Sequence, residues 1–367
     1  MQNITRSPLV NININTVADN CLTNAKPPLS GLCLRQDGWF DSQNPDINFL
    51  TWVNNVVIRI YLKNIWPEAN RFDFTVIRDW MAWAKRMRFN GLDIHFKLRI
   101  ICGCFSPMWM MTRVGSFPLS SEGFETLPGF DEASSNCIKF WEPEYLSLWG
   151  DLMQGLADEF DDEKYFNEVV MSATGPGTGE AMEFAISNNG SGEVRRDQYI
   201  AGGATPAKIK NAILTGIDAM GALQRTNIGI ALTKYWHMEN PTHGEITTTR
   251  EIGEHIASTY RERAVLGNNG LRIEDSPDGD KWQAPGGHMW QLSQHYRVMR
   301  VRYGSRVYFQ TASIPNMGGV ENLVPTLNNG LDLMSSLVEL PDNESKIKQY
   351  LTDLQLSTYK TAYKANE

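Results

Sequence analysis

A chain of 367 residues is long enough for two ordinary domains or one large one. Its hydrophobic content of 42% and charged content of 21% predict a folded, soluble protein and exclude an intrinsically disordered one. The net charge of −8 argues against a nucleic-acid partner, because phosphate binding requires a concentrated basic surface.

The first residues, 1–8, do not form a basic start followed by an apolar run, so we expect no signal peptide. No stretch approaches 18 apolar residues, which predicts that the chain has no membrane span. We therefore expect a protein of the cytoplasm or of a virus particle, and an oligomer or a particle assembly stays open. The five cysteines show no metal-ligand spacing, which favours free, buried thiols in a reducing compartment.

The N-terminal half begins with a polar, Asn-rich segment, residues 1–28, which we interpret as an irregular arm. A first strand is expected at 31–36 and a third at 94–102. The second, at 56–62, is an almost unbroken apolar run, which is typical of a parallel strand covered by helices on both faces. An amphipathic helix follows at 74–88, with apolar residues on one stripe.

The remainder of the chain continues the alternation of strands and helices. A long irregular loop is expected up to about residue 142, and a polar, Gly-rich stretch between the fourth strand and residue 205. The expected helices are 143–160, 206–223, 249–260, 289–302, 320–334 and 343–363. The expected strands are 166–172, 228–232, 264–266, 307–310 and 337–339.

The unit that runs from Val56 through Trp66-Pro-Glu68 to Trp80-Met-Ala-Trp83 resembles the second strand, loop and helix of one enzyme clan. These are the (β/α)8-barrel glycoside hydrolases of the large β-galactosidase and cellulase clan, and the resemblance covers about residues 30–363. It implies an α/β fold with a single (β/α)8 TIM barrel over 29–367, long βα loops and a peripheral arm at 1–28. Chemistry is then expected at the C-terminal ends of the strands.

Glycoside hydrolysis uses two carboxyl groups across the scissile bond, one of which donates a proton. The resembled clan carries its acid just beyond strand four, where this chain reads Gly175-Pro-Gly-Thr-Gly-Glu180. We therefore expect Glu180 to be the general acid/base, with Glu183 as the alternative. A purely structural interpretation, in which Glu180 caps a short helix, stays open.

The clan carries its nucleophile at the end of strand seven, where this chain has Gln310. A Gln can hydrogen-bond a sugar but can neither form a glycosyl ester nor take a proton. Three alternatives follow: Glu339 at the end of strand eight acts instead, Glu274 or Asp275 after strand six acts as a base, or the site binds without cleaving.

The expected substrate-binding residues are Arg59, Trp109, Trp236, His237 and Gln310. Arg59 alternates with apolar residues, and because a buried charge requires a partner, it should point into the barrel mouth towards a carboxylate. That partner is either a catalytic group or Glu339 as a structural carboxylate. The tryptophans offer flat rings on which sugars stack, or else they pack between loops.

No cofactor and no metal are expected. His237, Glu239 and His243 lack the helical spacing of a zinc motif, and the Asp-rich run 275–280 lacks the closing Glu of a calcium loop. Neither a dinucleotide or phosphate-loop motif nor a Gly-x-Ser-x-Gly turn occurs.

Two functional hypotheses result. The first is a glycoside hydrolase that acts on a β-linked oligosaccharide or polysaccharide. The second is a non-catalytic glycan-binding or structural barrel, such as a phage virion component.

Overall fold

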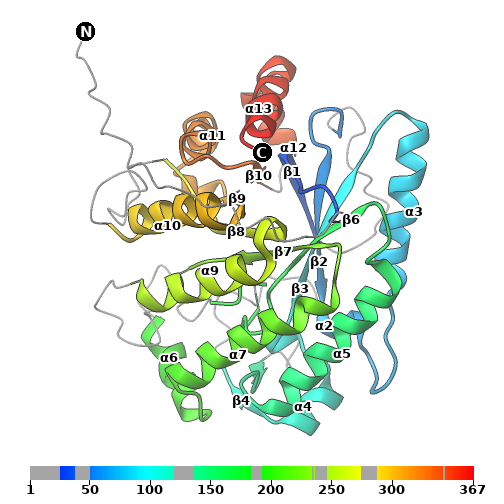
Figure 1. Cartoon of the computed structure of the whole chain (residues 1–367), viewed down its shortest axis with the longest axis vertical. Coiled ribbons are helices and arrows are strands. Elements are labelled where there is room, and N and C mark those ends of the chain that lie inside the picture. The colour runs from blue at the N-terminus through cyan, green and yellow to red at the C-terminus, as the bar shows by residue number, and fades with distance from the viewer. Residues whose placement is uncertain are drawn as a thin grey trace.

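The structure, a computed structural model, contains a closed barrel of eight parallel strands (Figure 1). It describes residues 25–37, 50–119, 135–177, 179–182, 192–233, 235, 246–273, 287–341 and 344–367. The barrel strands are β1 (Gly31–Asp37), β2 (Asn55–Tyr61), β3 (His95–Ile101), β6 (Phe166–Val170), β7 (Asn227–Ala231), β8 (Ala264–Leu271), β9 (Arg306–Thr311) and β10 (Leu337–Glu339).

Neighbouring strands of the barrel follow one another in the chain, and β10 closes the barrel by pairing with β1. Every pairing is parallel, so all strand C-termini lie at the same end. This confirms the expected (β/α)8 barrel, including the short strands near 264 and 337.

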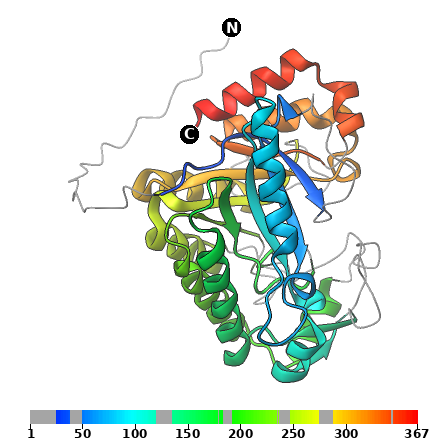
Figure 2. The ribbon, with the colours of Figure 1, turned by 90° about the vertical axis from the view of Figure 1, so that its right-hand side faces the viewer.

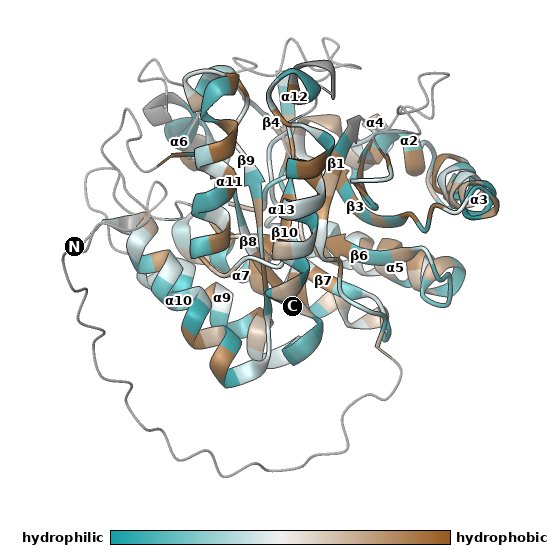
Figure 3. Cartoon of the chain, turned by 90° about the horizontal axis from the view of Figure 1, so that it is seen from above, coloured by the Kyte–Doolittle hydropathy of each residue, from teal (hydrophilic) through white to brown (hydrophobic). Residues whose placement is uncertain are grey.

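Helices surround the strands on the outside (Figures 1 and 2). They are α2 (Leu62–Ile65), α3 (Thr75–Phe89), α4 (Met108–Val114), α5 (Pro143–Phe160), α6 (Gly192–Ala201), α7 (Pro206–Ala219), α9 (Thr247–Tyr260), α10 (His288–Tyr303), α11 (Leu323–Asp332), α12 (Glu344–Tyr350) and α13 (Asp353–Ala365). Helix α7 packs between α5 and α9, and α9 packs against α10. Figure 3 shows mixed colour on the helices, as expected for amphipathic helices, and hydrophobic colour on strands such as β1 and β6.

Alternate residues of each strand face two different cores. Val56, Ile58 and Ile60 belong to the large core between strands and helices. Val57 belongs to a small cluster inside the barrel, with Leu29, Cys33, Val265, Tyr308 and Leu337. Leu29 lies just before β1 and the others lie in the first halves of their strands, so apolar side chains fill the N-terminal half of the barrel interior.

Three connections differ from the sequence-based expectations. The supposedly irregular loop before 142 contains α4 and a two-stranded antiparallel sheet of β4 (Ser116–Pro118) and β5 (Asn136–Ile138). The polar stretch before 205 contains α6. The single helix expected at 343–363 is two helices, because Thr352 and Gln355 form a capping box that starts α13.

Strand β8 is longer than the apolar run at 264–266 predicted, since it continues through Gly267-Asn-Asn-Gly270 to Leu271. Its pairing with β9 shifts register between Asn268 and Leu271, where the Asn268 side chain accepts from the Gly270 amide at 2.8 Å. A run that resembles a turn in sequence is therefore part of a strand with a bulge.

Of the expected N-terminal arm, residues 1–24 lie outside the described residues, whereas 25–28 pack beneath the barrel. The Lys26 ammonium is buried and donates to the Phe160 and Phe166 carbonyls at 3.0 and 2.6 Å. Burial lowers the pKa of Lys26 to about 8. This residue fastens the start of the described chain to the N-terminal end of the barrel.

Four cysteines, Cys33, Cys102, Cys104 and Cys137, are buried free thiols; Cys21 lies outside the described residues. Among the helices that the structure describes, none has the length and apolar character needed to cross a membrane.

We predict opposite effects of two glycine substitutions on stability. A Cβ at Gly229 would lie 2.4 Å from the Glu168 carboxylate, whereas a Cβ at Gly150, in α5, would meet no neighbour within 4 Å. Gly229→Ala should lower the free energy of unfolding by about 1–3 kcal/mol, and Gly150→Ala should raise it by about 1 kcal/mol. Urea denaturation measures both, and a Gly229→Ala variant as stable as the wild type would contradict the packing of Glu168.

Candidate functional site

Four charged side chains meet inside the barrel above the apolar cluster. We call Lys97 and Arg99 of β3, Glu168 of β6 and Glu339 of β10 the ionic quartet. The Lys97 ammonium lies 2.8 Å from Glu168 and 3.0 Å from Glu339. Arg99 reaches both Glu339 carboxylate oxygens at 3.1 Å. The two cations and two carboxylates balance in charge, and their side chains are at most 2% exposed.

Electrostatics within the quartet give its two carboxyl groups different properties. Burial alone would raise the pKa of Glu339, but Arg99 and Lys97 outweigh it and hold that pKa below its usual value. Glu168 forms its ion pair with Lys97, and burial raises the pKa of Glu168 above its usual value. Glu339 is therefore the firmly ionised member.

Arg99 connects the quartet to the seventh barrel strand. Its other terminal nitrogen donates to Gln310 Oε1 at 2.7 Å, and Gln310 lies beside Glu339 in the β9–β10 register. The side-chain amide of Gln310 is thus fixed with its oxygen on the arginine, which leaves its NH2 group to face elsewhere.

The partners of Glu339 are not the one that the sequence analysis left open, which was Arg59. Alternation with Val57 places Arg59 on the inner side of β2, but the ion pairs to Glu339 come from Lys97 and Arg99 of β3. Arg59 and Arg99 are register neighbours on adjacent strands. The arginine of β3 is the one that extends across to β10.

The loop after β6 brings Glu180 to the same end of the barrel. Thr174 donates to the Ala181 carbonyl at 2.6 Å, and Thr233, after β7, donates to the Met182 carbonyl at 3.0 Å. Gly179 has φ of +77°, and a Cβ there would lie 2.7 Å from the Arg99 side chain. The glycine before Glu180 is therefore required both by its backbone conformation and by the close approach to Arg99.

Glu180 is half-buried beside Asn269, Arg99 and Glu339. Burial raises its pKa and the negative charge of Glu339 adds to that rise, while Asn269 and Arg99 oppose it. Its environment thus favours the protonated form more than that of an exposed glutamate does.

Asn269 is held by Tyr308, whose hydroxyl donates to its Oδ1 at 3.1 Å. Tyr308 in turn lies over the quartet, with the Lys97 ammonium 3.2 Å from its ring centre. The Nδ2 of Asn269 is buried and faces Glu180, whose charged form the Asn269 side chain favours. An amide donor directed at Glu180 favours the carboxylate form of that residue and can also contact a polar ligand group bound there.

Glu180 and Glu339 therefore form a pair of interacting carboxyl groups whose pKa values move in opposite directions. Such a pair can supply a proton donor and an anion in one site. Glu180 is the group suited to donate a proton, and Glu339 the group suited to stay charged.

Trp109, in α4 after β3, is half-buried and packs edge-on against Trp66, with ring centres 5.2 Å apart. Its indole donates to the Trp66 carbonyl at 3.1 Å, so this ring joins two loops at the C-terminal ends of β2 and β3. Trp236, His237, Glu183, Glu274 and Asp275 lie outside the described residues.

The sequence interpretation missed Lys97, Arg99 and Glu168. Lys97 and Arg99 alternate with Phe96, Leu98 and Ile100, the same signal that identified Arg59 as inward-facing. Asn269 was missed because β8 was expected to end before it. In the part of the chain that the structure describes, no group of three or more His, Cys, Asp and Glu side chains is arranged to hold a metal ion.

Known structures with this fold include glycoside hydrolases. The catalytic domain of β-amylase from Paenibacillus polymyxa superposes with a TM-score of 0.55 at 11% identity, covering 91% of this chain and 98% of that one. Endo-glycoceramidase II from Rhodococcus sp. gives TM-scores of 0.51 as an iminocyclitol complex and as a lactosyl-enzyme intermediate. Those two structures are 10% and 11% identical and cover 93% and 92% of this chain and 80% of theirs. Neither a protein-family model nor a curated protein sequence matches the chain. These likenesses establish a shared barrel fold.

We expect Glu339→Gln to destabilise the protein by about 3–5 kcal/mol at neutral pH, because it leaves Lys97 and Arg99 buried with Glu168 alone. The folded pKa of Glu339 lies below its unfolded value. Its stabilising contribution is therefore present above the unfolded pKa and is lost as pH falls through the folded pKa. Urea titrations between pH 3 and pH 7 should show a flatter acid dependence in the variant.

Glu159→Gln is the matched control, since Glu159 accepts an arginine ion pair from Arg78 at 2.7 Å on the surface. It should change stability by less than about 1 kcal/mol. Equal decreases in the free energy of unfolding in the two variants would show that the buried ion pairs of the quartet stabilise the protein no more than a surface ion pair does.

Asn269→Ala should raise the pKa of Glu180 further, because the Asn269 amide favours the charged carboxylate. NMR titration of ¹³C-labelled glutamate side chains measures this, with Glu180→Gln identifying the resonance. Asn329→Ala, which removes a buried amide bonded to the Arg272 carbonyl at 2.9 Å, should leave that titration unchanged. If Asn269→Ala left the pKa of Glu180 unchanged, the Asn269 amide would not be stabilising the Glu180 carboxylate.

Proposed function

We propose that the chain is a glycoside hydrolase-like barrel that acts on a β-linked oligosaccharide or polysaccharide, with Glu180 as general acid/base and Glu339 as the charged carboxylate. The observation that carries the proposal is the placement of the Gly179–Glu180 segment against Arg99, which pairs with Glu339, at the barrel end where enzymes of this fold do their chemistry. Burial raises the pKa of Glu180, whereas Arg99 and Lys97 lower that of Glu339.

Each group has a defined task in this proposal. Glu180 gives its proton to the glycosidic oxygen as the bond to the anomeric carbon breaks. Water then adds its hydroxyl to that carbon, and the proton it releases restores Glu180. The ionised Glu339 stabilises the positive charge that develops on the sugar ring, through the low-dielectric interior and in concert with Arg99.

Sugar binding in this proposal rests on hydrogen bonds and ring stacking. Gln310 and Asn269 offer NH2 groups to hydroxyls, and Arg59 lies on the inward face of β2. Trp109, with Trp236 and His237 from the sequence interpretation, would contribute to the walls. The glycoside hydrolases named above share the fold, and one of them is a lactosyl-enzyme intermediate, which agrees with this class of substrate.

The second candidate is a barrel that binds glycans without cleaving them, as a virion component would. It is favoured by Gln310, which occupies the strand-seven position where the resembled clan has a glutamate, and whose oxygen accepts from Arg99. Full burial of Glu339, with both oxygens on Arg99, also restricts its access to a sugar carbon.

Glu180→Gln should lower kcat on natural oligosaccharides by about 10²–10⁴-fold without altering the fold, because it removes the proton donor while keeping the shape. The loss should be much smaller on aryl glycosides whose leaving group departs without protonation. In the wild type, kcat on natural substrates should fall as pH rises through the elevated pKa of Glu180. Glu159→Gln serves as the control, and circular dichroism verifies folding.

Gln310 separates the two candidates. Gln310→Ala should weaken glycan binding more than turnover, since an amide contributes hydrogen bonds and no proton transfer. A wild type that binds glycan and cleaves none, with activity appearing in Gln310→Glu, would select the non-catalytic barrel. If glycan binding and turnover were unchanged in both Glu180→Gln and Gln310→Ala, the site around Glu180 and Gln310 would not be the functional site.

A further inference from the structure

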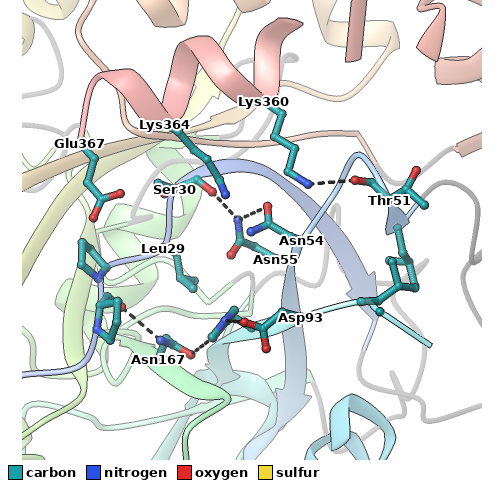
Figure 4. A pocket seen from close by; sticks show the side chains of 16 residues that line it. Leu29, Ser30, Thr51, Asn54, Asn55, Asp93, Asn167, Lys360, Lys364 and Glu367 are labelled. Carbon is teal, nitrogen blue, oxygen red and sulfur yellow. Dashed lines mark hydrogen bonds and ion pairs between the residues drawn. The ribbon is translucent and has the colours of Figure 1, made fainter. Parts of the chain in front are cut away.

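A pocket of about 410 Å³ opens at the N-terminal end of the barrel, opposite the site of Glu180. It is lined by the residues at or before the starts of β1, β2 and β3, by Asn167 near the start of β6, and by the last turns of α13. Figure 4 shows Lys360 and Lys364 extending from α13 towards Ser30, Asn54 and Thr51.

On one wall of the pocket, the polar side chains hydrogen-bond to one another or to nearby backbone carbonyls. His95 Nδ1 lies 2.8 Å from Asn167 Oδ1, and Asn167 Nδ2 donates to the Pro27 carbonyl at 3.1 Å. Asn55 Nδ2 donates to the Ser30 carbonyl at 2.7 Å. These groups hold the strand starts together and have little capacity left for a ligand.

The facing wall carries hydrogen-bond donors that remain available to a ligand. Lys360 makes one hydrogen bond, to the Thr51 carbonyl at 2.9 Å, from an ammonium with three hydrogens. Within the described residues, Lys364 has no hydrogen-bond or ion-pair partner, and neither do the Ser30 hydroxyl and the Asn54 NH2 group. All four groups present N–H or O–H donors to one space.

The charges around this space do not balance at the lysines. Asp93 is engaged by Lys164 at 2.9 Å and by His95 at 3.3 Å, and Glu367 lies at the rim. No carboxylate in the described chain forms an ion pair with Lys360 or Lys364. Two like charges four residues apart on one helix face repel each other, and burial followed by the charge of Lys364 lowers the pKa of Lys360.

From this arrangement we infer that the pocket binds an oxyanion, as phosphate or as the phosphate group of a small phosphorylated sugar, between Lys360 and Lys364. Ammonium groups bind phosphate as point charges, and Ser30 and Asn54 add neutral donors. The pocket volume of about 410 Å³ is more than ten times the roughly 30 Å³ that one water molecule occupies in the liquid. The pocket therefore has room for more than one tetrahedral oxyanion, and its volume falls in the range of small-molecule sites. The inference is independent of the function proposed for the opposite end.

Isothermal titration with inorganic phosphate, at constant ionic strength maintained with chloride, tests the site. The wild type should bind phosphate saturably. Lys364→Gln should weaken binding by about tenfold, and Lys360→Gln combined with Lys364→Gln should abolish it, since each removes a charge-assisted hydrogen bond. Lys364 makes no contact that the fold needs, so its single variant stays informative even if the double variant unfolds.

Lys208→Gln is the matched control, because Lys208 also donates from a helix to a backbone carbonyl, that of Gly203 at 3.0 Å. It should leave phosphate binding unchanged, and so should Glu180→Gln. Titration with a hexose 6-phosphate and with the uncharged hexose distinguishes the sources: tighter binding of the hexose 6-phosphate indicates a phosphorylated sugar, and equal binding indicates free phosphate. The inference fails if the wild type shows no saturable binding, if Lys208→Gln weakens binding as much as Lys364→Gln, or if the uncharged hexose binds as tightly.

Discussion

The ion pairs of Glu339 with Lys97 and Arg99 are the interaction on which the barrel interior depends. They join β3 to β10 across the barrel, and Lys97 adds β6 through Glu168. Buried ion pairs often contribute less stability than a hydrophobic filling of the same volume. A polar interior layer in place of branched aliphatic side chains therefore indicates a functional demand on this part of the barrel.

The same interior separates the two ends of the molecule. Leu29, Cys33, Val57, Val265 and Leu337 fill the space beneath the quartet, between the end that carries Glu180 and the end that carries the lysines of α13. The N-terminal end is additionally fixed by Lys26, whose three hydrogen bonds hold the start of the described chain under β6 and β7.

Local patterns were sufficient to predict the barrel. The apolar run of β2 and the amphipathic stripe of α5 each report burial that is visible within one element. The capping box of Thr352 and Gln355 is also a local pattern. The sequence analysis did not use it, and it therefore predicted one helix where the structure has α12 and α13. The site was less predictable, because Glu339 takes its partner from a strand 240 residues away, and no spacing rule within a strand selects Arg99 over Arg59.

That separation along the chain also bears on the order of folding. A nascent polypeptide that has emerged from the ribosome only as far as β9 has Lys97 and Arg99 but lacks the carboxylate of β10. Without β10, Glu168 is the one carboxylate of the quartet for two buried cations, and a buried charge without a partner is costly. The charge balance of the barrel interior therefore depends on the last strand, because β10 brings the second carboxylate as it closes the barrel.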